Sequence, residues 1–381
     1  MAQDLIAREV SKPFDLSEAP MIRTRLLRLG EQDHIALCTV HHIAFDAWSG
    51  GILFKELSEL YDAFSKGEAS PLPELPIQYA DYASWQREFL QGEVLENQLS
   101  YWKTQLAGAP PLLNLPTDRP RSDVPSYRGS REPFSLPAEL SAKLKELSRR
   151  EDVTLFMLLL ATFQTLLGRY SKQDDVCVGM SIAGRNRVEF EGLIGCFLNT
   201  LVLRTQLPAN LRFRELLQRV RETTLQAYAH QELPFEKLIA VLKPERNAGY
   251  MPLYQVLLDV INTPKRPVQT PGSLTLTPMV SDTATAKLDL VMDVWESDNQ
   301  LGGIIEYKTD LFDRETIVKM LGHFEMLLES IVNEPDARLS SLEMRTDAEK
   351  QQELTAQAER AAARHRKFIN LKPQALTLTK N

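Results

Sequence analysis

The sequence predicts a chain of two lobes with an α/β or α+β fold. Apolar runs of strand length, such as 175–182 (DVCVGMSI), occur between longer stretches whose apolar residues recur at helical spacing. Strands and helices that mix throughout a chain are typical of these two fold classes. Residues 116–127 (PTDRPRSDVPSY) contain three prolines and few apolar side chains, and they predict an exposed linker near the boundary between the lobes.

The first predicted lobe, residues 1–125, contains a short apolar run at 35–40 (IALCTV) that predicts a buried strand. Two histidines follow this strand, and residues 52–64 then have the apolar spacing of a helix. The histidines therefore lie at a junction of strand and helix, where scaffolds often present reactive groups. Residues 71–76 (PLPELP) predict a stiff connector, and residues 79–106 predict a second helix.

The second predicted lobe, residues 126–345, opens with a helical pattern at 137–168 that breaks near Asp152. Buried strands are predicted at 175–182 and 199–203, further strands at 254–261, 288–295 and 301–307, and helices at 213–228 and from Asp313 to Ile331. A third part, residues 346–381, begins rich in charge and alanine and ends without periodicity. It predicts a solvated helix followed by a linker.

Composition and charge exclude several classes of protein. The chain has 381 residues and is 43% hydrophobic and 25% charged, which is typical of a globular protein with two or three domain-sized units. Its 44 basic and 51 acidic residues give a formal net charge of −7, which argues against nucleic-acid binding because such proteins need a basic face. Neither GxGxxG nor GxxxxGK followed by Ser or Thr occurs, so nothing predicts a bound nucleotide.

Targeting and redox signals point to the cytoplasm. The longest apolar run, 155–163 (LFMLLLATF), is far too short to span a bilayer, and the N-terminal residues contain no apolar signal core. The three cysteines, Cys38, Cys177 and Cys196, form no CxxC motif and predict neither a disulfide framework nor a zinc knuckle. We therefore expect a cytoplasmic protein with no membrane partner.

The sharpest feature is the run 41–49 (HHIAFDAWS). Histidine suits general-base chemistry because its ordinary pKa lies nearest neutrality. Adjacent side chains at a strand end point to opposite sides, so His41 and His42 cannot both face one small cavity, and one is expected to be a packing partner. Asp46 is close enough to fix the loop or to pair with an arginine. The alternatives are two structural histidines at a turn and, more weakly, a metal site, for which no third ligand is spaced nearby.

This run resembles the HHxxxDG signature of the condensation domains of nonribosomal peptide synthetases. Five further segments resemble elements of that family in the same order: 79–86 (YADYASWQ), 115–121 (LPTDRPR), 195–201 (GCFLNTL, preceded by AGR at 183–185), 230–236 (HQELPFE) and 307–312 (YKTDLF). Together the resemblance covers about residues 12–345. Six motifs in the family's order indicate membership rather than coincidence.

The resemblance implies two lobes, each like a chloramphenicol acetyltransferase unit, arranged as a V with the histidine motif at its centre. A tunnel would join two faces at which donor and acceptor peptidyl carrier proteins dock. The acyl or peptidyl donor and the aminoacyl acceptor would arrive as thioesters on the phosphopantetheine arms of these partners, so the chain itself would bind no cofactor. The free amine would attack the donor thioester and form a peptide bond. Neighbouring adenylation or tailoring domains are implied as further partners.

The same resemblance assigns roles to individual residues. His42, the second histidine of the motif, would be catalytic, either accepting a proton from the amine or orienting the amine and stabilising the zwitterionic intermediate. Asp46 would be chiefly structural and held by an ion pair. The supporting residues, which would hold the loop or line and brace the tunnel, are His41, Trp48, Arg185, Asn199 and Gln231.

Two departures from the family pattern affect these expectations. Ala47 replaces the usual glycine, so the loop needs no positive φ there. The chain also lacks the family's first two motifs, SxAQxRLWFL and RHExLRTxF, so the first lobe is expected to be incomplete. The second of those motifs holds the arginine expected to pair with Asp46, and Arg23 and Arg25 do not match it. The chain would then be a fragment of a longer product or a shortened relative.

Three functions remain open at this point. The run 46–57 (DAWSGGILFKEL) resembles the condensation subtype that joins two L-configured residues. The first alternative is a condensation-like docking module that recruits a tailoring enzyme and no longer catalyses. The intact His42 and Asp46 argue against it. The second is a free-standing acyltransferase that uses a soluble thioester, against which the motifs around Trp85 and Asn199 argue.

Overall fold

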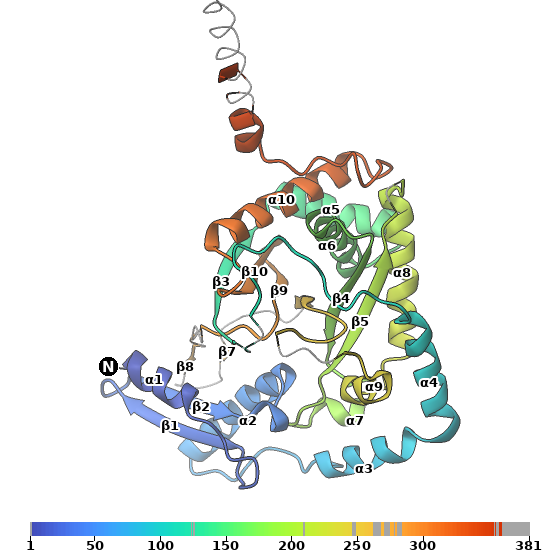
Figure 1. The fold of residues 1–381 in the computed structure, drawn as a ribbon. Coiled ribbons are helices and arrows are strands. Elements are labelled where there is room, and N and C mark those ends of the chain that lie inside the picture. Colours follow the sequence, from blue (N-terminus) through green and yellow to red (C-terminus); the bar gives the residue numbers. More distant parts are fainter. Residues whose placement is uncertain are drawn as a thin grey trace, which may run out of the picture.

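Figure 1 shows a computed structural model of the chain. It describes residues 2–353 except 123, 125, 209, 246–248, 262–267, 270–274, 278 and 280–283, and also residues 355, 358 and 359. The helices and strands are, in chain order, α1 (Ala2–Ser11), β1 (Ile22–Arg28), β2 (His34–Val40), the 3₁₀ turn η1 (His42–Ala44), α2 (Ala47–Ser65), α3 (Tyr79–Phe89), α4 (Gly92–Gln105), β3 (Gly129–Ser135), α5 (Ala138–Arg150), α6 (Leu155–Ser171), β4 (Asp175–Ile182), α7 (Val188–Glu191), β5 (Asn199–Gln206), α8 (Phe213–Ala229), α9 (Phe235–Leu242), β6 (Val256–Ile261), β7 (Val268–Gln269), β8 (Thr275–Leu276), β9 (Leu290–Ser297), β10 (Gln300–Lys308) and α10 (Arg314–Asn333).

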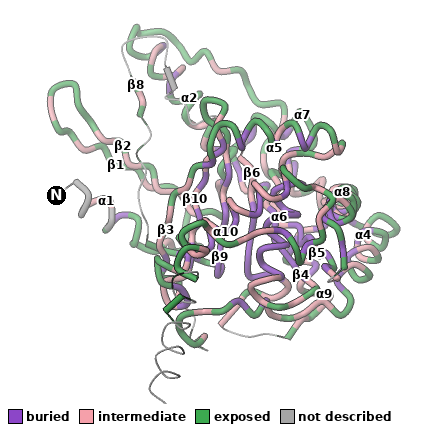
Figure 2. The backbone as a smooth tube through the Cα atoms, turned by 90° about the horizontal axis from the view of Figure 1, so that it is seen from above, coloured by how far each residue is buried: buried purple, intermediate pink, exposed green. Residues whose placement is uncertain are grey.

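A six-stranded mixed sheet forms the centre of the larger part of the chain. Its strand order is β3-β10-β9-β6-β4-β5, with β9, β6 and β4 parallel and the other neighbours antiparallel. Helices α5, α6, α8 and α10 pack against it, and their buried side chains join those of the strands in one core. Figure 2 shows the buried segments, in purple, concentrated there. The structure confirms the predicted mixture of strands and helices.

The central helix α6 is buried because it is apolar on nearly every side. Leu158 and Phe163 are fully covered, and the Thr154 hydroxyl caps the helix by accepting a hydrogen bond from the Met157 amide at 3.2 Å. The predicted break between α5 and α6 falls where Asp152 adopts a φ of 53°. Among the described residues no single helix could span a membrane. Helices α5 and α6 together have the length and composition of a span, but they are bent by 106°.

The N-terminal residues form a smaller part beside the large sheet (Figure 1). Strands β1 and β2 pair antiparallel in a two-stranded sheet, and α1 lies against β2. The prediction of a buried strand at 35–40 is wrong, because β2 alternates between exposed and half-buried residues, as expected where one face of a sheet meets solvent. Helix α2 forms over the predicted stretch. Several of its apolar side chains are exposed, namely Phe54, Leu57, Tyr61 and Phe64.

The single helix predicted at 79–106 is wrong, because the chain divides it into α3 and α4. The break falls at residues 90–91, and Gly92 follows it with a φ of +50°, a left-handed conformation that glycine adopts without strain. Helix α4 packs on the larger core, where Trp102 is 1% exposed and donates a hydrogen bond to the His230 carbonyl at 2.9 Å. Residues of this core therefore begin well before the end of the predicted first lobe.

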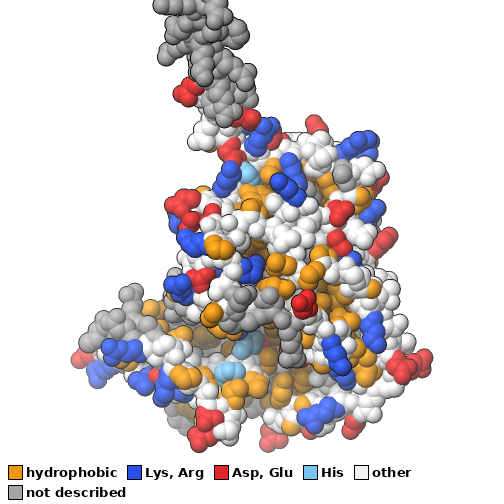
Figure 3. Space-filling view, in the orientation of Figure 1, with side chains coloured by type: hydrophobic (Ala, Val, Ile, Leu, Met, Phe, Trp, Pro, Cys, Tyr) orange, Lys and Arg blue, Asp and Glu red, His pale blue; other side chains and the backbone are white. Residues whose placement is uncertain are grey.

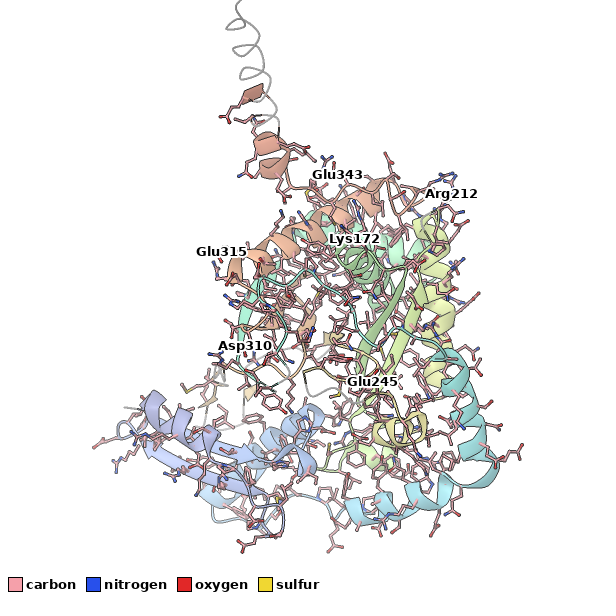
Figure 4. All side chains as sticks on the ribbon, viewed as in Figure 1. Lys172, Arg212, Glu245, Asp310, Glu315 and Glu343 are labelled. Atoms are coloured by element: carbon pink, nitrogen blue, oxygen red, sulfur yellow. The ribbon has the colours of Figure 1, made fainter. Side chains whose placement is uncertain are left out.

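The proline-rich segment at 116–127 is largely exposed, as predicted, and ion pairs fix it to the large sheet. Arg121 donates hydrogen bonds to both carboxylate oxygens of Asp289, which is 1% exposed. Just beyond the segment, Arg128 pairs with Asp310, which Figure 4 labels at the left of the large body. Arg121 therefore anchors this segment to the large sheet.

The chain after α10 is held to the body. Thr346 and Glu349 form a capping box at the start of a helix at 347–353: the Thr346 amide donates to Glu349 Oε2 at 2.9 Å, and the Glu349 amide donates to Thr346 Oγ1 at 3.3 Å. The same carboxylate lies 2.7 Å from the buried His323 and 2.8 Å from Lys319, both on α10. The described residues of this helix are mostly exposed, as predicted, and Glu349 fixes its first turn to α10. The predicted terminal linker lies outside the described residues.

Glu349 contributes a pH-dependent part of the stability. Burial raises its pKa, but contacts with Lys319, Thr346 and His323 outweigh burial and lower the pKa of Glu349 to about 2. A carboxylate whose pKa is lower in the folded than in the unfolded state stabilises the fold above its unfolded pKa, and this contribution is lost as the pH falls through the folded pKa.

We therefore expect Glu349→Gln to lower the melting temperature at neutral pH. Its difference from the parent should shrink as the pH falls from about 4.5 towards 2. Thermal melts followed by circular dichroism at neutral pH and near pH 3 measure this difference. An equal difference at both pH values would contradict the assigned ion pairs.

Candidate functional site

The histidine motif folds as a strand end, one turn of 3₁₀ helix and a helix start. His41 follows β2 with an extended backbone, and its Nδ1 accepts a hydrogen bond from the Ile43 amide at 3.1 Å. His42 then begins η1. Asp46 caps α2, because its Oδ1 accepts a hydrogen bond from the Ser49 amide at 2.8 Å. The loop is therefore closed by its own side chains, and Ala47 needs no left-handed φ, as predicted.

His41 belongs to the packing of the N-terminal part. Its ring lies edge-on to that of Phe14, with the ring centres 5.8 Å apart. The Arg23 guanidinium lies 3.8 Å from the centre of the Phe14 ring, and its Nε pairs with Glu9 at 2.7 Å. Arg25 pairs with the same carboxylate at 2.8 Å. Both arginines that fail to match the family's second motif are therefore engaged with Glu9.

Asp46 pairs with Arg185 in a buried polar cluster. Arg185 Nη2 donates to Asp46 Oδ1 at 3.1 Å and to Oδ2 at 3.3 Å, and the two side chains are 0% and 2% exposed. Arg185 Nη1 donates to the Phe190 and Leu193 carbonyls at 2.6 and 2.7 Å. The Ser49 hydroxyl lies 3.0 Å from Arg185 Nη2 and 2.7 Å from Asp46 Oδ1. We call Asp46, Ser49 and Arg185 the Asp46 cluster.

The identity of this arginine corrects an expectation. The family resemblance placed the partner of Asp46 in a motif that the chain lacks, whereas the structure supplies Arg185, which lies 139 residues further along the chain. Burial raises the pKa of Asp46, but hydrogen bonds from Ser49 and Phe197 and the charge of Arg185 hold that pKa below its usual range. The pair is therefore ionised at neutral pH. Its arginine comes from the turn after β4 rather than from the front of the chain.

The Asp46 cluster holds residues 195–197, which we call the bridging segment. The Ser49 hydroxyl lies 3.1 Å from the Gly195 amide and 2.9 Å from the Gly195 carbonyl. The Phe197 amide donates to Asp46 Oδ2 at 3.0 Å. A segment that precedes β5 is thus bound to the first turn of α2 through both ends.

Aromatic residues of α3 hold the bridging segment from another side. The Tyr79 hydroxyl donates to the Cys196 carbonyl at 2.7 Å, and the Tyr79 ring lies edge-on to that of Phe197 at 5.1 Å. The buried residues of this smaller apolar cluster are Tyr82, Phe190, Leu193 and Phe197. Burial raises the pKa of Tyr82 to about 12, so its hydroxyl stays protonated. The bridging segment is therefore fixed between α2 and α3.

Gly184 permits the turn that precedes Arg185. It has a φ of +64°, and a Cβ there would overlap the Phe197 carbonyl oxygen. We expect Gly184→Ala to destabilise the chain by about 2 kcal/mol or more, because left-handed strain and a backbone clash act together. Gly192→Ala is the matched control, since Gly192 has a φ of −87° and its Cβ would meet nothing closer than 3.8 Å. Urea unfolding compares them, and equal midpoints for the two variants would contradict this role.

His42 is an exposed member of the motif, and Cys196 lies beside its ring. Cys196 Sγ is 3.7 Å from His42 Nδ1. Figure 3 shows histidine side chains, in pale blue, in a hollow between the N-terminal part and the large body, with hydrophobic side chains around them. Cavities of 130 and 210 Å³ lie elsewhere, beside α6 and between α5 and α10. Because His42 is exposed, a reactant can reach its imidazole without displacing a buried group.

Trp48 and Asn199 hold backbone groups. Trp48 Nε1 donates to the Glu191 carbonyl at 3.0 Å, although the indole is about half exposed. Asn199 Nδ2 donates to the Gln231 carbonyl at 3.0 Å, and its Oδ1 accepts from the Phe235 amide at 2.9 Å. Backbone groups occupy all four hydrogen-bonding positions of the Asn199 amide. In the structure Asn199 therefore braces the start of α9.

This arrangement offers the chemistry of the His42 imidazole, held by the loop and the bridging segment described above. In the described part of the chain, no group of three or more His, Cys, Asp or Glu side chains is placed to hold a metal ion. Burial raises the pKa of the Cys196 thiol, so the sulfur keeps its proton at neutral pH. The exposed His42 imidazole can accept a proton or donate a hydrogen bond to a reactant.

Comparison with known proteins decides the family. The family model described as "Condensation domain" matches residues 1–354. The chain belongs to the condensation-domain family. One of the linear gramicidin synthase proteins of Brevibacillus parabrevis is 47% identical over 363 residues, which are 95% of this chain and 5% of that protein. The condensation domain thus spans only a small part of the length of the curated relatives it matches.

Solved structures show the same fold. The X-domain in its complex with OxyB from teicoplanin biosynthesis matches with a TM-score of 0.83 and 29% identity, over 91% of this chain and 78% of that chain. The four-domain nonribosomal peptide synthetase holo-AB3403, bound to AMP and glycine, also matches with a TM-score of 0.83, at 24% identity, over 92% of this chain and 27% of that chain. The expected condensation-domain fold is confirmed.

Sequence reasoning missed three residues that hold the motif of this condensation domain: Ser49, Tyr79 and Cys196. Ser49 follows Asp46 by three positions, the spacing at which a capping side chain meets a backbone amide, so a local signal existed. Cys196 carried no such signal, because it lies 154 residues from His42 and no periodicity links them. Tyr79 lies 117 residues from the carbonyl that it contacts.

Proposed function

We propose that the domain forms a peptide (amide) bond between an acyl or peptidyl donor and an aminoacyl acceptor, each held as a thioester on a carrier protein. The observation that carries this proposal is the exposed His42 imidazole, whose Nδ1 lies 3.7 Å from Cys196 Sγ in the bridging segment that the buried Asp46 cluster holds. Membership of the condensation-domain family and the similarity to linear gramicidin synthase proteins support the same activity.

In this reaction the acceptor amine attacks the carbonyl carbon of the donor thioester. A carbon–nitrogen bond forms, the carbon–sulfur bond breaks, and the donor sulfur leaves as a thiol that takes up one proton lost by the amine. The intermediate between these events has a negative oxygen and a positive nitrogen. His42 can serve the step either by accepting the amine proton or by a hydrogen bond to the charged intermediate.

The other residues of the site hold His42 in place. The Asp46 cluster fixes the first turn of α2, and His41 closes the loop through the Ile43 amide. Much of the acceleration is expected from positioning, because two tethered reactants meet as if in one molecule. The phosphopantetheine arms belong to the carrier proteins, so this proposal gives the domain no cofactor of its own.

We propose donor and acceptor carrier proteins as the partners of the domain, with adenylation or tailoring domains near it. The similarity to a four-domain nonribosomal peptide synthetase supports such a multidomain setting. Action in the cytoplasm is part of the same proposal. The free thiols of Cys38, Cys177 and Cys196 fit a reducing compartment.

Intact-protein mass spectrometry of the acceptor carrier tests this function. The domain is mixed with one carrier protein loaded with an acyl donor and another loaded with an amino acid. We expect the acceptor carrier to gain the mass of the donor acyl group. A folded domain that transfers no acyl group across several donor and acceptor pairs would contradict the proposal.

A second candidate function is the recruitment of a tailoring enzyme without catalysis. It is favoured by one observation, the similarity to an X-domain that was solved in complex with OxyB. The same transfer experiment separates the two functions. A docking module would bind its partner enzyme and leave the mass of the acceptor carrier unchanged.

A further inference from the structure

We propose that Cys196 is a positioning residue for His42, and that its thiol donates a hydrogen bond to His42 Nδ1 and so leaves the proton of the neutral imidazole on Nε2. This inference rests on the proposed function, because it concerns how His42 serves amide formation. It also selects between the two roles left open for the imidazole, since a ring with its proton on Nε2 presents a hydrogen-bond donor to a reactant.

The contact between the two side chains is direct. Cys196 Sγ lies 3.7 Å from His42 Nδ1, within the range of a hydrogen bond that involves sulfur. His42 is exposed and Cys196 is half-buried, so the thiol approaches the ring from the protein side. The nearby His41 has a different partner for its own Nδ1, the Ile43 amide at 3.1 Å. The two histidines of the motif are thus held by separate groups.

The backbone fixes Cys196 in this position. Its own carbonyl accepts a hydrogen bond from the Tyr79 hydroxyl at 2.7 Å. The residue before it is bound to Ser49 through both its amide and its carbonyl, and the amide of the residue after it donates to Asp46. These hydrogen bonds restrain the backbone at Cys196, so its thiol moves mainly by rotation about χ1. The thiol is therefore presented to His42 by the same cluster that fixes the start of α2.

The proton of the contact belongs to sulfur. Burial raises the pKa of the Cys196 thiol, so the sulfur keeps its proton and can donate it, weakly, while the sulfur is also only a weak acceptor. Neutral imidazole has one N–H and one acceptor nitrogen, so a donor at Nδ1 requires the ring proton to be on Nε2. Nε2–H can then stabilise the oxygen that becomes negative when the amine attacks. The amine proton would pass to the leaving sulfur or to solvent instead of to the ring.

Nitrogen NMR of the ¹⁵N-histidine-labelled chain tests the tautomer without any substrate. The chain has six histidines, and the His42 signals are assigned by their loss in His42→Gln. We expect the parent to hold His42 with its proton on Nε2. Cys196→Ala, and Cys196→Val as a variant of similar size, should give a mixture of tautomers, whereas Cys196→Ser should keep the parent state. A parent ring with its proton on Nδ1, or equal tautomer populations in the parent and in Cys196→Val, would overturn the proposal.

Transfer kinetics give the second readout. Cys196→Ala should lower kcat by about two- to tenfold with KM unchanged, which is the fold-change expected for one hydrogen bond of about 0.5–1.5 kcal/mol. Cys196→Ser should restore most of this loss, and Cys38→Ala, which removes an exposed thiol from β2, should change nothing. A kcat that falls equally in the Ala and Ser variants would overturn the positioning role. If the domain transfers nothing at all, the proposed function fails, while the tautomer measurement still tests the contact.

Discussion

Arg185→Ala is expected to lower the free energy of unfolding by about 3–5 kcal/mol, because it leaves the Asp46 carboxylate buried without its ion partner. The Asp46 side chain is only 2% exposed, so water cannot replace the guanidinium. The variant also leaves the Phe190 and Leu193 carbonyls without their donor. Urea unfolding followed by circular dichroism measures the loss as a fall in the midpoint.

Arg187→Ala is the matched control for this prediction. Arg187 is exposed, and its guanidinium lies 4.5 Å from the centre of the Trp85 ring, so its removal should cost no more than about 1 kcal/mol. The double variant Asp46→Ala/Arg185→Ala should lose less than the sum of the two single variants, because neither partner is then left charged and alone. An Arg185→Ala midpoint close to that of Arg187→Ala would contradict a structural ion pair.

The large core could be predicted from the sequence because its signals are local. The apolar run of α6 is buried on nearly every side, and the strand at 175–182 appears with the predicted bounds. The break between α5 and α6 is also marked locally, by Asp152 with a positive φ and by the capping Thr154. Elements like these are specified by their own residues, whatever packs against them.

The missed strands have no such signals. β1 (IRTRLLR) and β3 (GSREPFS) are rich in polar residues, and in the described part of the chain each has a strand neighbour on one side, β2 for β1 and β10 for β3. Their extended conformation comes from backbone hydrogen bonds to the neighbouring strand. Because many of their side chains are exposed, the sequence shows no continuous apolar run. The apolar spacing of α2 predicted the helix but not which of its side chains would be covered.

The candidate site likewise combines features that neighbouring residues specify with contacts that depend on the tertiary fold. The histidine motif was found because its residues are adjacent, and the capping role of Asp46 is equally local. The partner of Asp46 was misplaced because an ion pair over 139 residues depends on the tertiary fold, which brings the turn after β4 to the start of α2. The contact of Cys196 with His42 depends on the same fold, so only the structure reveals it.

His42→Ala is expected to lower the rate of acyl transfer by about 10²- to 10⁴-fold, the range for loss of a residue that moves a proton or stabilises the charged intermediate. The stability of the domain should hardly change, because the side chain is exposed and, among the described residues, its contact is that of Nδ1 with Cys196. The fall should appear in kcat, since the carrier proteins would bind elsewhere on the domain. His34→Ala, which removes an exposed histidine at the start of β2, should transfer at the parent rate.

The most direct measurement is therefore the rate at which the acceptor carrier gains the donor mass, followed by intact-protein mass spectrometry for the parent, His42→Ala and His34→Ala under identical loading. If the Asp46 cluster presents His42 to the reactants, the parent and His34→Ala transfer at the same rate, and His42→Ala is slower by at least about 10²-fold while unfolding at the parent midpoint. Transfer by His42→Ala at the parent rate would contradict the placement of His42 at the centre of the reaction.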